Sequence, residues 1–86
     1  MPEISRFYGI FITINFNDHN PPHFHARYGE QNGIFDIQSM KMLEGNLPKI
    51  AVKLVSKWIA IHEIELMENW NLVKNEQLPI KITPLD

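Results

Sequence analysis

The sequence predicts an α+β fold, in which a three-stranded antiparallel β-meander packs on one long or broken C-terminal helix in the order β-β-β-α. Three observations support this prediction. Apolar residues alternate over residues 8–16 and 23–28, Asn32-Gly33 is typical of a hairpin turn, and apolar residues recur at helical spacing over 47–73. A chain of 86 residues can build only one core, so we expect residues 1–86 to form a single domain.

The first two predicted strands rest on a period of two. In the first segment the alternating apolar residues are Tyr8, Ile10, Ile12, Ile14 and Phe16. In the second segment Phe24, Ala26 and Tyr28 alternate with polar residues, and a polar loop at 17–22 separates the two segments. Because successive side chains of a strand point to opposite faces, each strand has one apolar and one polar face.

The Asn32-Gly33 pair predicts how the second and third strands are paired. A type I′ turn needs positive φ at both central positions, which this dipeptide tolerates. The turn places Tyr28 opposite Ile37, and both of these residues belong to apolar faces. The turn and the hydrophobic pattern therefore predict the same pairing.

When the apolar residues of the first two predicted strands are matched, Phe16 stands opposite Phe24. The pairs that follow are Asn15 with His25 and Thr13 with Arg27. The outer face of the sheet is then predicted to carry Thr13, Asn15, His23, His25, Arg27, Asp36 and Gln38.

The apolar stripe over residues 47–73 predicts the helix, and Pro48 suits its first turn. Unbroken to Asn75, such a helix would be roughly 40 Å long, about twice the span of the sheet. We therefore expect a break near His62, or a second half that packs on something else, such as a partner chain. The tail is expected to add a short edge strand at Ile80 to Thr83.

The composition excludes several classes of protein. A net charge of −2 excludes a broadly basic, DNA-coating surface, so any contact with nucleic acid has to be local. The absence of cysteine excludes disulfides and thiolate zinc sites, and makes a reducing cytoplasm the expected setting. The apolar run at residues 7–16 is too short to span a membrane. We expect a soluble, cytoplasmic protein.

Three of the four histidines lie within the stretch "DHNPPHFHAR". His23 and His25 are two residues apart on a strand, so their side chains point the same way. His19, on the proline-stiffened loop, and Asp18 are candidates to complete a metal site. Imidazole and carboxylate ligands suit zinc, nickel or another first-row divalent metal.

The same residues also fit acid/base chemistry. His23 and His25 are candidate catalytic residues because one imidazole can be protonated while the other is free. Arg27 on the same face is a candidate phosphate contact, and Asn15 a candidate to orient an imidazole or bind substrate. Such a set of residues suits metal-free cleavage of RNA. A third interpretation is a polar sheet face whose histidines only bond nearby carbonyl groups.

Lys49 and Lys53 are further candidate substrate-binding residues at the start of the predicted helix. They lie opposite the apolar stripe, where a solvated helix face is the alternative explanation.

The segments "ISRFYGIFITINFNDHNPPHFHARYGE", "LEGNLP" and "HEIELMENW" carry a family resemblance. Over nearly its whole length the chain resembles the small bacterial proteins of domain-of-unknown-function family 4160, and the pattern F-x-D-H-x-P-P-H-F-H-x-x-Y-G-E is specific to that family. Asn20 stands where many relatives have a third proline. Members are often encoded beside another small protein, as toxin–antitoxin pairs are. The resemblance therefore implies an antitoxin-like partner encoded next to this protein.

A weaker likeness is to the HicA-type mRNA interferase toxins, whose fold resembles a double-stranded-RNA-binding domain. The shared parts are a strand histidine, which is His23 or His25 here, a third strand, an "EGNL" entry and a helix from Pro48. The first helix of that fold is missing here, and Pro21-Pro22 replace the glycine-serine before the toxin histidine.

Three functions are therefore expected from the sequence. The first is a toxin–antitoxin-type component that acts on RNA through the histidines, as a ribonuclease-like toxin if it is an enzyme. The second is a non-catalytic module that binds a divalent metal. The third is a regulatory protein-interaction partner that uses its helix, and in each case we expect a homodimer or a complex with another protein.

Overall fold

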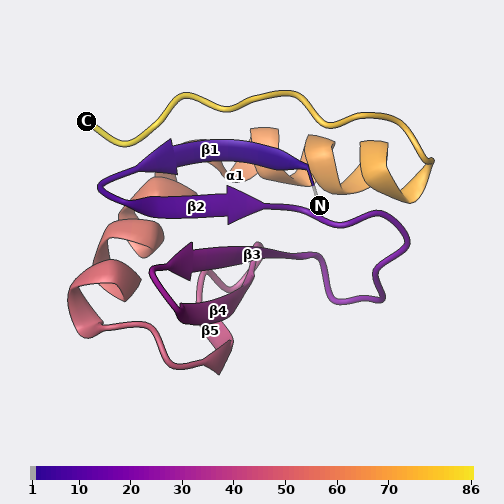
Figure 1. Cartoon of the computed structure of the whole chain (residues 1–86). Coiled ribbons are helices and arrows are strands. Elements are labelled where there is room, and N and C mark those ends of the chain that lie inside the picture. Colours follow the sequence, from indigo (N-terminus) through magenta and orange to yellow (C-terminus); the bar gives the residue numbers. More distant parts are fainter. Residues whose placement is uncertain (1) are drawn as a thin grey trace.

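The computed structural model describes residues 2–86 and consists of one antiparallel sheet and one long helix (Figure 1). The elements are β1 (Glu3–Phe7), β2 (Ile10–Thr13), β3 (His23–Tyr28), β4 (Gln31–Asp36), β5 (Met42–Gly45) and α1 (Lys49–Lys74). The strands follow one another across the sheet in chain order, β1-β2-β3-β4-β5. The α+β class and the meander are confirmed, but the predicted number of three strands is wrong because the sheet has five.

The two strands that the sequence did not reveal lie at the edges of the sheet. β1 pairs with β2 through an irregular register between Glu3 and Ser5, which breaks the period of two in its sequence. Three of the four residues of β5 are exposed, so β5 has no apolar face to produce a pattern. Hydrophobic periodicity detects a strand only when one of its faces is buried.

The predicted first strand over residues 8–16 is too long at its start. Tyr8 and Gly9 form a turn between β1 and β2, with φ of 51° and 76°. The residues on both sides of this turn are apolar and buried: Phe7 ends β1 and Ile10 begins β2. The apolar alternation therefore continues through the turn, so it does not show where one strand ends and the next begins.

The hairpin between β3 and β4 turns at Gly29-Glu30, and the predicted turn at Asn32-Gly33 is wrong. Tyr28 pairs with Gln31, six residues before the predicted partner Ile37. A shift by an even number of residues keeps every side chain on its face, so the hydrophobic pattern cannot detect it.

Gly33 lies inside β4 for a packing reason. A Cβ atom there would stand 2.8 Å from Sδ of Met42 and 2.9 Å from Cδ1 of Leu47. Glycine at this position therefore permits close approach of β5 and the chain that follows it.

The pairing of β2 with β3 is also displaced from the predicted register, by two residues. Thr13 pairs with His25, and Arg27 pairs with Phe11 instead of Thr13. Phe16, which was predicted to pair with Phe24, lies beyond β2 in the loop and is 36% exposed. The displacement is again even, so His25 and Arg27 keep the predicted outer face.

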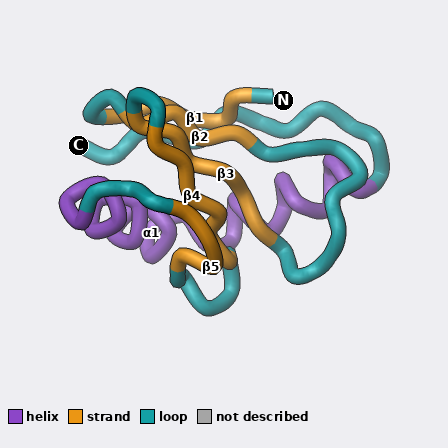
Figure 2. Tube along the Cα trace, turned by 60° about the horizontal axis from the view of Figure 1, so that its bottom comes forward, coloured by secondary structure: helices purple, strands orange, loops and turns teal. Residues whose placement is uncertain are grey.

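Helix α1 covers one face of the sheet (Figure 2), and the core lies between the two layers. The fully buried large side chains include Phe24 and Phe35 from the strands and Trp58 and Trp70 from the helix. The rings of Phe24 and Phe35 stack with centroids 5.6 Å apart, and the ring of Trp58 meets Phe24 edge-on. The outer face, which carries Phe11, Thr13, His25 and Arg27, is turned away from α1.

The predicted break in the helix is confirmed at His62, whose φ of −118° and ψ of 23° are not helical. The second half of α1 buries Leu66, Trp70 and Val73 in the same core as the first half. The kink thus lets one long helix pack on a short sheet within a single chain. Within residues 2–86, no helix is both long and apolar enough to cross a bilayer.

The tail after α1 runs back in extended form beside β1 (Figure 1). The backbone N–H of Ile82 donates to the carbonyl of Ile4 at 2.8 Å, but residues 77–86 form no regular strand. The predicted edge strand at Ile80 to Thr83 is therefore reduced to this single pairing. Side chains of α1 hold the tail instead, because the Trp58 indole donates to the carbonyl of Thr83 at 2.9 Å.

Candidate functional site

Three ligand-type side chains meet where the loop at residues 14–22 enters β3. They are Asp18, His23 and His25, which we call the Asp-His-His cluster, and one ligand atom of each lies within 4.8 Å of the others. Oδ2 of Asp18 is 3.1 Å from Nε2 of His23 and 3.6 Å from Nε2 of His25. The alternation of β3 puts the two histidines on one face, and the loop brings the carboxylate to both.

The ring of His23 is held at both nitrogens. Its Nδ1–H donates to the carbonyl oxygen of Pro21 at 2.7 Å, since a carbonyl can only accept. This bond turns Nε2 toward Asp18. The ring also packs on the indole of Trp70, with centroids 5.2 Å apart, and only 13% of the side chain is exposed.

Asn15, which lies in the loop two residues after β2, positions His25. The side-chain amide nitrogen of Asn15 lies 3.2 Å from Nε2 of His25 and donates to it when that nitrogen carries the lone pair. The Oδ1 atom of Asn15 is buried and has no hydrogen-bond partner among the described residues. Thr13 is the residue paired with His25, so the contact from Asn15, two residues further along the chain, is a diagonal one.

The structure leaves the other predicted site residues outside this cluster. His19 is exposed, and it does not belong to the group of ligand atoms that converge. Lys49 and Lys53 are exposed on α1, which covers the opposite face of the sheet from the outer face. Arg27, by contrast, lies on the outer face two residues along β3 from His25.

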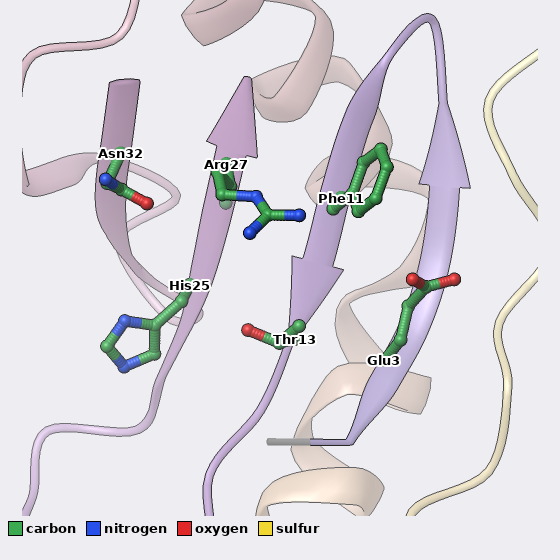
Figure 3. Close-up of a pocket in the computed structure, with 7 residues that line it drawn as sticks. Glu3, Phe11, Thr13, His25, Arg27 and Asn32 are labelled. Atoms are coloured by element: carbon green, nitrogen blue, oxygen red, sulfur yellow. The ribbon is translucent and has the colours of Figure 1, made fainter. Parts of the chain in front are cut away.

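Arg27 and His25 line a pocket of about 370 Å³ on the outer face (Figure 3). The lining residues are Glu3, Phe11, Thr13, His25, Ala26, Arg27 and Asn32. They come from four neighbouring strands, β1 to β4. His25 is the one residue that belongs both to this pocket and to the Asp-His-His cluster.

Charges around the pocket are partly neutralised. Arg6 donates to Oε1 of Glu3 at 2.8 Å, and this hydrogen bond lowers the pKa of Glu3 below the ordinary value of 4.5. The guanidinium carbons of Arg6 and Arg27 lie 4.1 and 4.9 Å from the centroid of the Phe11 ring. Arg27 forms no ion pair with any described carboxylate, so it is the charged group of the pocket without a direct partner.

Trp70, Phe11 and Glu3 help to build these sites, although none of them was a predicted site residue. Trp70 lies within the apolar stripe that predicted the helix, and its ring also supports His23. Phe11 and Glu3 were not recognised as site residues because the pairing of β1 with β2 was not predicted. Phe11 is an odd-numbered apolar residue on a strand whose core residues are even, and this exception was the available signal.

The fold and the cluster define a class of protein: a small α+β domain in which a kinked helix backs a β-meander and an Asp-His-His cluster lies at the start of the middle strand. Comparison with family models gives the particular assignment. The model for the family described as "Domain of unknown function (DUF4160)" matches residues 9–71, and the chain belongs to this family. The match includes all three cluster residues. No curated protein and no solved structure matches the chain.

Proposed function

We propose that the protein binds one divalent transition-metal ion of the zinc type through Asp18, His23 and His25. The observation that carries this proposal is the spacing of the ligand atoms. Zinc bonds of about 2.0–2.2 Å in a tetrahedral site put neighbouring ligand atoms roughly 3.3–3.6 Å apart. The carboxylate oxygen of Asp18 is 3.1 and 3.6 Å from the two imidazole nitrogens, and all three ligand atoms lie within 4.8 Å of one another, so a modest contraction of the cluster would bring them onto one ion.

The hydrogen bond of His23 supports the same assignment. Histidines that bind a metal commonly donate their second ring N–H to a carbonyl or carboxylate, which fixes the tautomer and the ring orientation. The Nδ1–H of His23 donates to the carbonyl of Pro21, so in the neutral ring the lone pair lies on Nε2, and an ion there would take the place of a proton shared with Asp18. The proline-stiffened loop thus acts as the outer support of a ligand.

The chemistry that the ion supplies depends on the number of protein ligands. Three protein ligands are typical of catalytic zinc sites, in which the ion polarises a bound water or carbonyl group. Asp18 supplies the negative charge that partly neutralises a divalent ion, while both histidines bind as neutral ligands. The cluster is 13–29% exposed, so an ion is accessible from solvent.

Acid/base cleavage of RNA by the same histidines is less well supported. It requires at least one imidazole to be free to exchange a proton with a substrate. Nδ1 of His23 is bonded to the carbonyl of Pro21, and the Nε2 atoms of both histidines converge on the Asp18 carboxylate, so neither ring nitrogen of His23 is directed at a separate substrate. This arrangement favours the metal-binding function over the ribonuclease function.

Zinc binding by the full-length chain, prepared without a histidine tag, tests the proposal. We expect one zinc ion per chain by elemental analysis, and a loss of binding of at least a hundredfold in His23→Ala and His25→Ala. His19→Ala is the matched control, because His19 lies between Asp18 and His23 in the sequence but outside the cluster, and this variant should bind as the wild type does. Absence of zinc binding in the wild type, or equal loss in all three variants, would contradict the proposal.

A further inference from the structure

The pocket on the outer face is a second site, distinct from the Asp-His-His cluster. Its volume of about 370 Å³ falls within the range of small-molecule sites, roughly 300–1,000 Å³. Its apolar surface includes the ring of Phe11, while a few polar side chains reach it from separate strands. An apolar body with one polar group is the kind of ligand that such a pocket accepts.

The charge of the pocket indicates the sign of that polar group. Glu3 is paired with Arg6, so these two charges largely cancel. Arg27 is exposed, has no carboxylate partner in residues 2–86 and lies over the Phe11 ring. The net charge that a ligand meets is therefore positive, which selects an anion.

The donors around Arg27 indicate the kind of anion. The guanidinium group presents several N–H donors, the hydroxyl of Thr13 is a further donor on β2, and the amide of Asn32 is another on β4. In Figure 3 the hydroxyl of Thr13 and the guanidinium of Arg27 both project over the sheet between β2 and β3. A phosphate monoester has three terminal oxygens for these donors, whereas a carboxylate has two.

We propose that this pocket binds a small organic phosphate monoester, with Arg27 and Thr13 holding the phosphate and Phe11 contacting the organic group. Arginine suits this role because its planar fork of donors matches phosphate oxygens. His25 forms one wall of the pocket, so the bound phosphate lies next to the cluster. The binding contacts themselves do not require a metal ion.

Calorimetric titration with phenyl phosphate tests the pocket in the full-length chain. Arg27→Gln should weaken binding at least tenfold, because it removes the charged donor, and Arg27→Lys should recover part of the affinity. Thr13→Val should weaken binding severalfold, and benzoate should bind less tightly than phenyl phosphate. Lys53→Gln is the matched control, because it removes one exposed positive charge on the opposite layer, and its affinity should equal that of the wild type.

The outcome is separable from that of the metal site. Asp18→Asn should weaken zinc binding at least a hundredfold while it changes the affinity for phenyl phosphate less than about threefold. The inference is overturned if the wild type does not bind phenyl phosphate at millimolar concentration. It is equally overturned if Arg27→Gln, with an unchanged melting temperature, binds as tightly as the wild type or if Lys53→Gln loses as much affinity as Arg27→Gln.

Discussion

Oδ2 of Asp18 lies 3.1 Å from Nε2 of His23, although Asp18 belongs to a loop and His23 begins a strand. Asp18 is the only carboxylate in the described residues that joins the two histidines in a ligand group. It is therefore the residue on which the charge balance of a bound divalent ion depends.

Asp18→Asn should weaken zinc binding at least a hundredfold, because a neutral amide replaces the anionic ligand while the shape of the side chain is kept. The affinity can be measured by competition with a coloured chelator. Glu44→Gln removes an exposed carboxylate from β5 and serves as the control, with no expected change. Equal affinities in Asp18→Asn and the wild type would show that the carboxylate is not a ligand.

The pKa of Glu3 should lie below 4.5 in the folded protein, because Arg6 donates a hydrogen bond to the carboxylate. A lowered folded-state pKa contributes stability that is present above the unfolded-state value and is lost as the pH falls through the folded-state value. A pH titration followed by NMR should give a low midpoint for Glu3. Arg6→Gln should raise this midpoint, and Lys81→Gln should raise it less. A midpoint that is insensitive to Arg6→Gln would remove the assigned cause.

Asn69→Ala should lower the free energy of unfolding by about 1–3 kcal/mol, because the side chain makes two hydrogen bonds that hold the tail. Its Nδ2 donates to the carbonyl of Ile80 and its Oδ1 accepts from the N–H of Ile80, both at 2.8 Å. Urea denaturation measures the loss, and faster amide exchange at Ile80 locates it. Asn71→Ala, at an exposed position two residues away, should change stability by no more than about 0.5 kcal/mol.

Gly45→Ala should destabilise the fold by about 2–4 kcal/mol, because strain and overlap act together. Gly45 has a φ of +132°, and a Cβ atom there would lie 2.3 Å from the carbonyl oxygen of Asn32. Gly29→Ala is the matched control: its φ is +61°, but nothing lies within 4 Å of the added atom, so about 1 kcal/mol is expected. Equal losses in urea denaturation would mean that close approach of β4 and β5 is not the cause.

Several features of the fold could be predicted because they repeat along the chain. The buried residues Ile10, Ile12, Phe24 and Ala26 were recognisable from a period of two, since one face of their strands lies in the core. Comparing the length of the helix with the span of the sheet gave two alternatives, a break near His62 or packing on something else, and the structure has the kink. Edge strands such as β5 could not be found in this way, because exposed residues leave no apolar pattern.

The candidate site was predictable in its residue types and incomplete in its geometry. The spacing of His23 and His25 placed both rings on one side of β3, where the structure brings them together. Whether Asp18 or His19 would join them depended on the path of the loop at residues 14–22. Neighbours in sequence point in different directions on a loop, and no periodicity constrains them.

The sequence by itself determined which faces are apolar and which residue types are available as ligands, because these properties follow from local pattern; for the long helix it left a bend near His62 as one of two alternatives. Only the tertiary structure decided the strand register, the choice of Asp18 over His19 and the support of His23 by Trp70. A shift by two or six residues leaves the hydrophobic pattern of a strand unchanged. Contacts between distant segments must therefore select the register, and with it the atoms that meet at the site.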